Sequence, residues 1–437
     1  MTIIRADVVL TVDSHGHIFR PGFVAIEDDR IVEVGSASTR SGSDIIDLGP
    51  RLIMPGLVNA HTHTPMVLFR GISEGHSLLT FEGWYNTIRV VEEAMTPDMV
   101  APAVAISCAE MIRTGTTTFA DQYFYTDEIV PIVRQSGMRA ALAYGIVELG
   151  DDIARRRELA HAGEFLASIQ NDQMIKGWVG PHAFFVDNTE ETMRGEMALA
   201  DRYDAGLHIH FSTTGEEDTY CMEHYGTTAV HQMDRMGIFE WPVLAAHCIS
   251  IPEDDLTLLA GRPFYAVIAA SAGMRAGAGA APLKAMIEAG INTAIGTDNV
   301  SNNNSYDLFK EMQIIGKVMS LREKTPGAIP AETIVRMATL GGARALGLEQ
   351  EIGSLEAGKK ADLIALNLTE IGWGPSRAQD VYTALVYAIS GMHVTDVMVN
   401  GNWLLRDRQW TTLDYRKASR ELDEAYSALQ DKLVKTV

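Results

Sequence analysis

The sequence predicts an α/β protein, a (β/α)8 TIM barrel with a small composite β-sandwich domain built from both ends of the chain. From about residue 56 onward, eight short apolar segments alternate with long helical patterns. This alternation is typical of strand–helix units that close into a parallel barrel. The chain before and after this region contains short β-branched runs. These runs are too few at either end to form a stable sheet, so we expect the two ends to pair with each other.

The first elements are strands, and the barrel follows them. Residues 1–55 contain the strand patterns VVLTV, FVAIEDD and RIVEVG. The eight barrel strands are predicted in GLVNAHTH, GTTTFAD, RAALAYG, KGWVGPHA, GLHIHF, VLAAHC, FYAVIA and NTAIGTD. Their nearly continuous hydrophobicity is typical of strands covered on both faces. Helical patterns lie between them, for example over Pro97–Arg113 and Glu190–Tyr203.

The C-terminal part returns to strands and ends in a helix. A helical pattern covers Thr333–Leu346, and strand patterns follow in ADLIALNL and VTDVMVNGNWLL. The last segment, Tyr415–Val437, has apolar residues spaced for one helix face. We therefore expect residues 56–352 to form the barrel. Residues 1–55 and residues 353–437 are expected to form the two parts of the composite β-domain, the second with the terminal helix.

Charge and composition exclude several classes of function. Of the 437 residues, 46% are hydrophobic, and 36 Lys and Arg against 57 Asp and Glu give a net charge of −21. Because a protein with this negative charge repels phosphate backbones, we expect a small-molecule substrate and no nucleic acid. Neither an apolar run of the ~20 residues that a membrane helix needs nor a signal-peptide pattern is recognised, so we expect no membrane partner. Three cysteines make no disulfide framework, which favours the cytoplasm.

Histidines and one aspartate gather where the predicted barrel strands end. Two His-x-His pairs end the first and fifth strands, and single residues end the fourth, sixth and eighth. The set consists of His61, His63, His182, His208, His210, His247 and Asp298. Barrel enzymes place their chemistry at these strand ends. Because imidazoles with a carboxylate suit Zn²⁺ or Fe²⁺, the sequence predicts a metal site at the barrel mouth.

Each member of this set also has a plainer explanation. A single histidine in a buried strand is usually a hydrogen-bonded core residue. Asp298 would also suit the N-cap of a helix over Val300–Leu308. Seven placements spread over five strand ends on one face of a barrel favour the metal site over a coincidence of core residues.

The motifs resemble those of the amidohydrolase superfamily. They are PGLVNAHTH with Arg70–Gly71 after it, GTTTFAD, GPHA, HIH, AHC, GTDNVSNNN and the tail MATLGGARALGLEQEIGSLEAGKKADLIAL. They cover nearly the whole chain in the family's order. Within the superfamily, the chain looks most like the branch that contains adenosine-type and S-adenosylhomocysteine deaminases and s-triazine hydrolases.

The resemblance implies a mononuclear metal site. His61, His63, His210 and Asp298 are its implied ligands. His247 is implied either as a hydrogen-bonding neighbour of the site or as a fifth ligand. The implied ion is one divalent metal, Zn²⁺ with Fe²⁺ as the alternative. The resemblance also allows a homo-oligomer, a dimer or larger.

The expected chemistry is hydrolysis by an activated water molecule. Binuclear relatives carry a bridging lysine at the end of strand four, where this chain has Gly180–Pro181–His182, so we expect one ion. A bound ion would lower the pKa of water toward ~7. Asp298 is the expected base that takes the proton and passes it to the leaving group. His247 is expected to orient the attack and to stabilise developing charge.

Two departures from the family lie on the substrate side. Ring deaminases carry a proton-shuttling glutamate three residues after the metal histidine of strand five, and this chain has Thr213 there. A hydroxyl cannot perform a carboxylate's proton transfer, so Glu216 or Glu217 is the alternative if the loop brings one of them back. On strand seven, the deaminase pattern H-x-P-x-S-N-x-K-L is replaced by VIAASAGMRAGAGAAP, which looks more like a triazine hydrolase.

Four further residues are candidates for substrate contact beside Thr213. Arg275 offers a planar fork to a carboxylate or to ring acceptors, or is a surface charge in a Gly/Ala loop. By position, Glu92 resembles a family residue that touches ribose, although a solvated helix face beside Glu93 suits it as well. His182 resembles a residue that lines the pocket. Trp84 suits stacking on a planar substrate or packing in the core.

The sequence therefore predicts a metal-dependent hydrolase that attacks an sp² carbon, in the first place an aminohydrolase (deaminase) of an N-heterocyclic small molecule. One alternative is an s-triazine-type hydrolase that displaces chloride or a thioether, which strand seven favours. The other is a metal-binding pseudoenzyme that has lost the proton-shuttle glutamate at Thr213.

Overall fold

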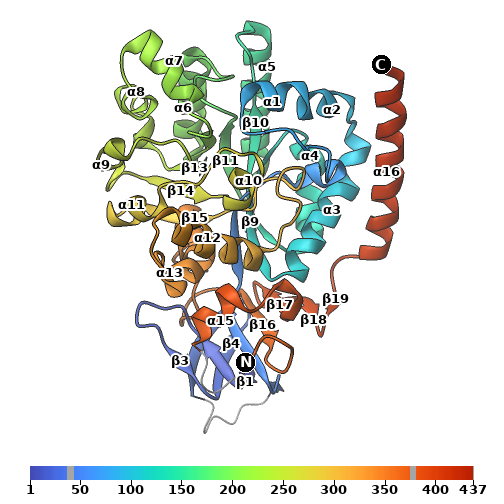
Figure 1. Cartoon of the computed structure of the whole chain (residues 1–437). Coiled ribbons are helices and arrows are strands. Elements are labelled where there is room, and N and C mark those ends of the chain that lie inside the picture. Colours follow the sequence, from blue (N-terminus) through green and yellow to red (C-terminus); the bar gives the residue numbers. More distant parts are fainter. Residues whose placement is uncertain (37–43, 375–379, 437) are drawn as a thin grey trace.

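Eight parallel strands form a barrel at the centre of the molecule (Figure 1). The computed structural model describes residues 1–36, 44–374 and 380–436. Each barrel strand pairs with the next one along the chain. The strands are β8 (Leu57–Thr62), β9 (Thr116–Tyr123), β10 (Arg139–Ile146), β11 (Ile175–Pro181), β12 (Leu207–Phe211), β13 (Val243–His247), β14 (Phe264–Ile268) and β15 (Asn292–Ile295). Five of them lie within the predicted segments, and β9, β10 and β11 extend beyond theirs by one or two residues, so the barrel is confirmed.

The segment that follows β15 joins the last strand of the barrel to the first. The backbone N–H of Asp298 donates to the carbonyl of His61 at 3.0 Å. One residue earlier, the N–H of Thr297 donates to Oδ1 of Asn59 at 3.0 Å, and the amide of Asn59 donates to the Thr297 hydroxyl at 2.8 Å. These three hydrogen bonds lie at the mouth of the barrel, so they fix Asp298 beside the end of β8.

Helices surround the barrel and cover its outer face (Figure 1). The helices up to β13 are α1 (Phe81–Asn86), α2 (Ile88–Ala94), α3 (Pro97–Arg113), α4 (Thr126–Ser136), α5 (Asp152–Ile169), α6 (Glu190–Tyr203), α7 (Glu216–Tyr225) and α8 (Ala229–Met236). The later ones are α9 (Leu256–Leu259), α10 (Ala270–Arg275), α11 (Leu283–Glu288), α12 (Leu308–Arg322), α13 (Ala331–Arg336), α14 (Gly342–Ala345), α15 (Val381–Tyr387) and α16 (Tyr415–Thr436). Within the described ranges, no helix has both the length and the apolar character to span a bilayer.

The expected single helix over residues 333–346 is interrupted. A π-helical turn, Met337–Gly341, separates α13 from α14. Gly342 packs so closely on β8 that a Cβ there would lie 2.7 Å from Cβ of Val58. The chain therefore passes tightly beneath the first barrel strand at this point, and only a glycine fits.

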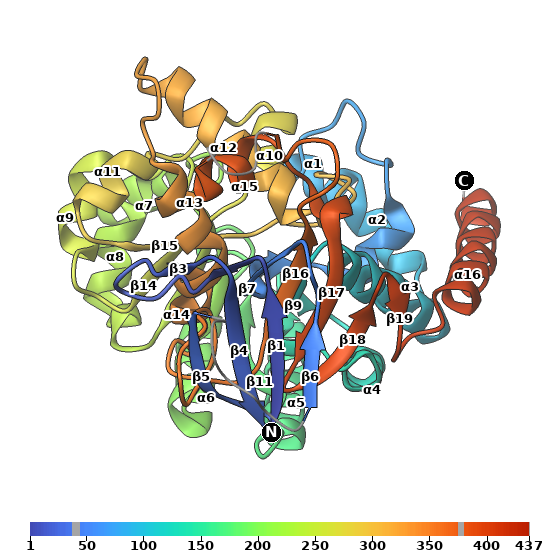
Figure 2. The same cartoon turned by 90° about the horizontal axis from the view of Figure 1, so that it is seen from below.

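The two ends of the chain combine in two sheets below the barrel, as Figure 2 shows from that side. Their strands are β1 (Thr2–Ala6), β2 (Val8–Leu10), β3 (Ile18–Phe19), β4 (Gly22–Glu27), β5 (Arg30–Ser36), β6 (Asp44–Asp47), β7 (Arg51–Pro55), β16 (Leu363–Asn367), β17 (Val394–Val399), β18 (Asn402–Arg406) and β19 (Gln409–Trp410). One sheet has the order β5-β4-β1-β6, and the other β19-β18-β17-β16-β7-β2-β3.

The second sheet contains strands from both termini. Strand β7 pairs antiparallel with β16 along its whole length, from Pro55 opposite Leu363 to Arg51 opposite Asn367. Side chains of the two sheets share one apolar core, in which Ile4 and Val24 of the first sheet pack with Ile53 of the second. The composite β-structure thus has the form that the sequence predicts. The domain boundaries at residues 55 and 352 stay a prediction.

A buried ion pair joins the barrel to this composite β-structure. Arg139, the first residue of β10, donates from Nε to Asp362 Oδ2 at 3.1 Å and from a terminal nitrogen to Oδ1 at 3.3 Å. The backbone N–H of Asn400 also donates to Asp362 Oδ1, at 2.7 Å. Both charged side chains are almost fully buried. Each therefore depends on the other for its stability in the interior.

We expect Arg139→Ala to lower the free energy of unfolding by about 3–5 kcal/mol, because it leaves the Asp362 carboxylate buried without its counter-charge. Urea titration of the metal-free protein measures this change. The matched control is Arg262→Ala, which removes a half-exposed ion pair with Asp234 and should cost less than about 1 kcal/mol. Equal losses in the two variants would contradict the prediction.

Candidate metal centre and active site

Five side chains converge at the carboxyl ends of the barrel strands. His61 and His63 come from the end of β8, His210 from β12, and His247 from the last position of β13. Asp298 comes from the segment after β15. Ligand atoms of His61, His210 and His247 all lie within 4.8 Å of one another, and so do those of His61, His63 and Asp298. The structure thus brings together the five residues proposed from the sequence as ligands.

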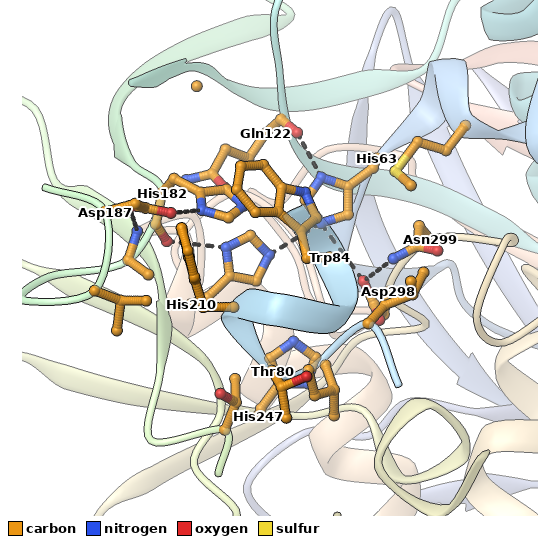
Figure 3. A pocket seen from close by; sticks show the side chains of 18 of the residues that line it. His63, Thr80, Trp84, Gln122, His182, Asp187, His210, His247, Asp298 and Asn299 are labelled. Atoms are coloured by element: carbon orange, nitrogen blue, oxygen red, sulfur yellow. Dashed lines mark hydrogen bonds and ion pairs between the residues drawn. The ribbon is translucent and has the colours of Figure 1, made fainter. Parts of the chain in front are cut away.

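Hydrogen bonds from the far side of each ring fix how the histidines face the centre. Nδ1 of His63 lies 2.7 Å from the carbonyl oxygen of Gln122, so it carries the proton and donates. Nδ1 of His210 donates in the same way to the carbonyl of His182, at 2.9 Å. Both Nε2 atoms are therefore left without a proton, and they face each other at 3.1 Å (Figure 3). Two bare lone pairs at that distance repel unless a cation lies beside them.

Burial keeps these rings neutral. It lowers the pKa of His63 to about 4, and it also lowers the pKa values of His61, His210 and His247. A neutral imidazole is the form that binds a metal ion. Three ring nitrogens are buried and have no hydrogen-bond partner: Nε2 of His61 and both nitrogens of His247. These nitrogens offer unshared electron pairs to a metal, and the carboxylate of Asp298 lies among them. Such a set of ligand atoms fits a divalent metal ion of the zinc class.

Asp298 completes this group. Its Oδ1 lies 3.6 Å from Nε2 of His61 and 3.5 Å from Nε2 of His63. The amides of Asn299 and Asn302 donate to its two oxygens, at 2.9 and 3.3 Å, and so orient the carboxylate. The N-cap explanation is wrong, because residues 300–307 are not helical and α12 begins at Leu308 with Asp307 as its cap.

Two of the converging residues have strained backbones. Asp298 has a φ of 61° and His247 a φ of 80°, both in the left-handed region. This conformation costs a non-glycine residue about 1–3 kcal/mol, and it persists where the surrounding structure imposes it. Such strain is concentrated at functional sites, in agreement with the converging donors.

A cavity of about 820 Å³, solvent at its mouth included, opens above the converging side chains. Its apolar wall consists of Met66, Leu78, Leu79, Phe81, Trp84, Phe124, Ala183 and Val186. The Trp84 ring lies 4.6 Å from the ring of His182, centroid to centroid, and Figure 3 shows the two side by side. The cavity therefore offers a planar, aromatic surface next to the donors.

A model of the amidohydrolase family matches residues 52–404, which is most of the chain. The chain belongs to the amidohydrolase family.

Curated relatives of this amidohydrolase include deaminases. A 5′-deoxyadenosine deaminase of Methanosarcina barkeri is 36% identical over 432 residues, with 98% of each chain covered. A 5-methylthioadenosine/S-adenosylhomocysteine deaminase of Moorella thermoacetica is 36% identical over 406 residues, covering 91% of this chain and 93% of the relative.

Solved structures show the same fold. An adenosine deaminase from Xanthomonas campestris, with bound zinc, superposes with a TM-score of 0.92 at 29% identity and covers 98% of both chains. The atrazine chlorohydrolase of Arthrobacter aurescens, in complex with zinc, superposes with a TM-score of 0.88. At 23% identity over 98% of this chain and all of that one, this second likeness shows the fold alone.

The loop after β12 carries the departure from the family at Thr213. Thr213, Glu216 and Glu217 all line the cavity. Glu216 accepts a hydrogen bond from the backbone N–H of Phe81 at 3.1 Å, which ties this loop to α1. Glu217 is buried; its Oε1 accepts from the N–H of Ser212 at 2.8 Å, while its Oε2 has no partner. Burial raises the pKa of Glu217 to about 7, so the loop contains a carboxyl group that holds a proton near neutral pH.

The other predicted substrate contacts divide into two groups. His182, Trp84 and Glu92 line the cavity, and Glu92 is buried although its neighbour Glu93 is exposed. Burial raises the pKa of Glu92 to about 7. Arg275 lies outside the cavity lining, and its guanidinium pairs with Glu74 at 2.7 Å on the surface. The structure therefore supports the surface-charge interpretation of Arg275.

Several residues that support the site are absent from the sequence predictions. Asp121 accepts hydrogen bonds from Thr62 and Thr64, on either side of His63, and so holds the end of β8. Asp187 pairs with Nδ1 of His182, and its charge outweighs burial and raises the pKa of that histidine. Asp121 ends the GTTTFAD motif at a strand end, and that position is the signal that could have identified it.

A glycine that is not a ligand should control metal binding. A Cβ at Gly296 would lie 2.7 Å from Cβ of His61 and 2.8 Å from Val267. We expect Gly296→Ala to displace His61 and to weaken zinc binding by roughly 10–100-fold, as changes next to a ligand typically do. Competition with a zinc-binding dye measures the affinity. Gly290→Ala strains a left-handed backbone (φ 77°) without meeting a neighbouring atom, so it shows what a loss of stability alone does to the affinity.

Wild-type zinc affinity in a folded Gly296→Ala variant would contradict this account of the site.

Proposed function

We propose that this amidohydrolase is a zinc-dependent deaminase that hydrolyses the exocyclic C–N bond of an adenosine-type nucleoside. Water adds its oxygen to the ring carbon, and the amino group leaves as ammonia. The observation that carries the proposal is the pair of unprotonated Nε2 atoms of His63 and His210, which face each other at 3.1 Å beneath an aromatic cavity. The names of the relatives point to the same substrate class.

His61, His63, His210 and Asp298 would hold the ion, with His247 as a fifth donor beside them. When bound, a divalent ion at such donors lowers the pKa of a water molecule and so supplies a nucleophile at neutral pH. Zinc in the related adenosine deaminase structure supports Zn²⁺ over Fe²⁺. One ion is proposed, because Gly180–Pro181–His182 occupies the place of a bridging lysine at the end of β11.

Asp298 is the proposed proton carrier. Its carboxylate is held by two amides and lies next to the imidazoles, so it can accept a proton from the attacking water and pass it to the leaving amino group. His247, buried and neutral with both nitrogens available, would hold the water or the developing oxyanion in line with the ring carbon.

The aromatic wall would position the substrate. Trp84 and His182 form a surface on which a purine ring can stack. Glu92 and Thr213 border the same space, and we propose both as substrate contacts. The protein's acidic charge agrees with a small molecule as its partner and with no nucleic acid. The three buried, unpaired cysteines support the expected cytoplasmic location, and a homo-oligomer stays a prediction.

The proposed source of the ring proton is Glu217. A general acid works best when its pKa lies near the working pH. Glu217 meets this condition, is buried, and has a free oxygen in the cavity lining, whereas the hydroxyl of Thr213 does not release a proton in this range. This assignment allows ring deamination without the family's glutamate.

Two alternatives make different predictions. A triazine-type hydrolase is favoured by the Gly- and Ala-rich segment after β14, which forms the short helix α10 and the loop beyond it. A pseudoenzyme is favoured by Thr213. The complete donor set and the deaminase relatives favour the deaminase over both.

Turnover of a substrate panel tests the proposed function. We expect the zinc-loaded protein to release ammonia from adenosine or 5′-deoxyadenosine. The absorbance change of the purine monitors the reaction. Chloride release from an s-triazine would favour the first alternative. If the zinc-loaded protein turned over none of the purines, pterins, pyrimidines, triazines and simple amides tested, the pseudoenzyme would be favoured. Asp298→Ala is the matched control and should abolish turnover, a loss of at least about 10²-fold. Near-normal activity in that variant would remove its proposed role.

The proton donor is tested by Glu217→Gln, which keeps the acceptor for Ser212 but removes the acidic proton. We expect kcat for a purine nucleoside to fall by about 10²-fold and its decline above neutral pH to disappear. Adding Thr213→Glu to that variant should restore activity, because it returns the family's carboxyl group. Glu223→Gln, at an exposed acid on the same helix outside the cavity lining, serves as the control. An unchanged kcat in Glu217→Gln would show that Glu217 only supports the loop.

A further inference from the structure

Five carboxyl groups line the cavity above the converging side chains, those of Glu92, Asp187, Glu216, Glu217 and Asp298. Its basic residues, over the described part of the chain, are histidines: His63, His182, His210 and His247. Over the described part of the chain, no lysine or arginine lines it. Asp298 lies among the histidines of the proposed metal site, Asp187 is paired with His182, and Glu217 is the proposed proton donor to the ring. Glu92 and Glu216 are therefore the acids left to border the remote part of a substrate.

Apart from the two ring nitrogens of His247, the unused polar side-chain atoms described in this cavity are oxygens. Oε2 of Glu92, Oε2 of Glu217 and Oε1 of Gln122 are buried and make no hydrogen bond. All three residues line the cavity and are more than nine-tenths buried. A buried acceptor without a partner is costly, so a bound ligand should present hydroxyl, amide or amine donors to Gln122 and, once their carboxyl groups are ionised, to Glu92 and Glu217. A carboxylate or phosphate presents only further acceptors.

The nearest arginines are already engaged. Arg89 lies over the ring of Phe124, 5.3 Å from its centroid, and its nitrogens are 3.8 Å from both Glu92 and Glu93. Arg275 is bound to Glu74 on the surface. An anionic substrate group would have to displace an existing carboxylate partner before it gained a cation.

A second cavity lies beyond Glu92 and Phe124, which line both spaces. A substrate tail that extended past Glu92 and Phe124 would meet its lining. Its two arginines are Arg89 and Arg157, and Arg157 pairs with Glu158 at 2.6 Å. The carboxylates lining it outnumber them: Glu92, Glu93, Asp127, Glu128, Glu158 and Glu164. This path is acidic as well, so it offers an anionic tail no better environment.

We propose, on the basis of the proposed function, that the enzyme selects nucleosides whose part remote from the reacting ring carbon is neutral or cationic and rich in hydrogen-bond donors. It discriminates against derivatives that carry a carboxylate or phosphate at the 5′ position. Like charges brought together in a desolvated site oppose binding, and this gives specificity by repulsion of the wrong substrate.

A matched series of adenosine derivatives tests this proposal with the zinc-loaded enzyme. The series is 5′-deoxyadenosine (neutral), S-adenosylhomocysteine (zwitterionic, with a carboxylate) and adenosine 5′-monophosphate (dianionic at pH 8). We expect kcat/KM for the monophosphate to be at least about 100-fold below that of the neutral nucleoside, with S-adenosylhomocysteine in between. A monophosphate value within threefold of the neutral one would overturn the proposal and leave the deaminase function intact.

Charge reversal on the wall supplies a second test. Glu216→Lys should raise the ratio of kcat/KM for the monophosphate to that for 5′-deoxyadenosine by at least about tenfold. The control is Glu74→Lys, at an exposed position outside the cavity, where the ratio should not change. An unchanged ratio in a folded Glu216→Lys protein would overturn the proposal.

If the protein is not a deaminase, substrate binding tests the charge selection instead of turnover. If the zinc-loaded protein released ammonia from none of the three compounds, their binding would be compared by calorimetry. At least tenfold tighter binding of the neutral nucleoside would support charge selection in a protein that is not a deaminase. Equal affinities, or no binding of any of the three, would overturn charge selection too.

Discussion

The site depends on the way the outer nitrogens of its histidines are held. His63 and His210 each donate from Nδ1 to a backbone carbonyl, of Gln122 and of His182. These carbonyls belong to β9 and to the end of β11, so neighbouring strands set the protonation of rings on β8 and β12. Because burial also keeps the rings neutral, their inner nitrogens face one another as bare acceptors. The barrel thus imposes a shape and a charge state that only a cation relieves.

The substrate side of the cavity is built on different principles. Its walls are apolar and aromatic, and the helices α1 and α2 that contribute Trp84 and Glu92 lie over the mouth of the barrel (Figure 1). Glu216, at the start of α7, accepts from the N–H of Phe81 in α1, and Thr214 in the loop after β12 donates to the carbonyl of Leu79. Rigid strand ends therefore hold the chemistry, while connecting segments form the walls that determine which molecule enters.

The sequence was informative where residue spacing and strand ends determine position. Side chains alternate along a strand, so the spacing of two placed His61 and His63 on the same face of the first barrel strand. Because barrel enzymes carry their chemistry at the carboxyl ends of strands, the polar residues at five strand ends could be assigned to one site. It was uninformative where a long-range contact decides. Glu92 and Glu93 are adjacent acids, yet one is buried and the other exposed, because only Glu92 faces the cavity. Arg275 depends on the path of a glycine-rich loop, and the cap of α12 at Asp307 depends on turns that no period reveals.

The join between β15 and β8 has a further consequence. There the ring of strands is held by Asn59, Thr297 and the N–H of Asp298, a few ångströms from the histidines. An ion held by residues from both sides of that join would cross-link the beginning and the end of the barrel. Since binding to the folded state alone adds to its stability, the supply of the ion and the persistence of the fold become one linked equilibrium. A cell that lacks the metal would then lose folded protein as well as catalytic activity.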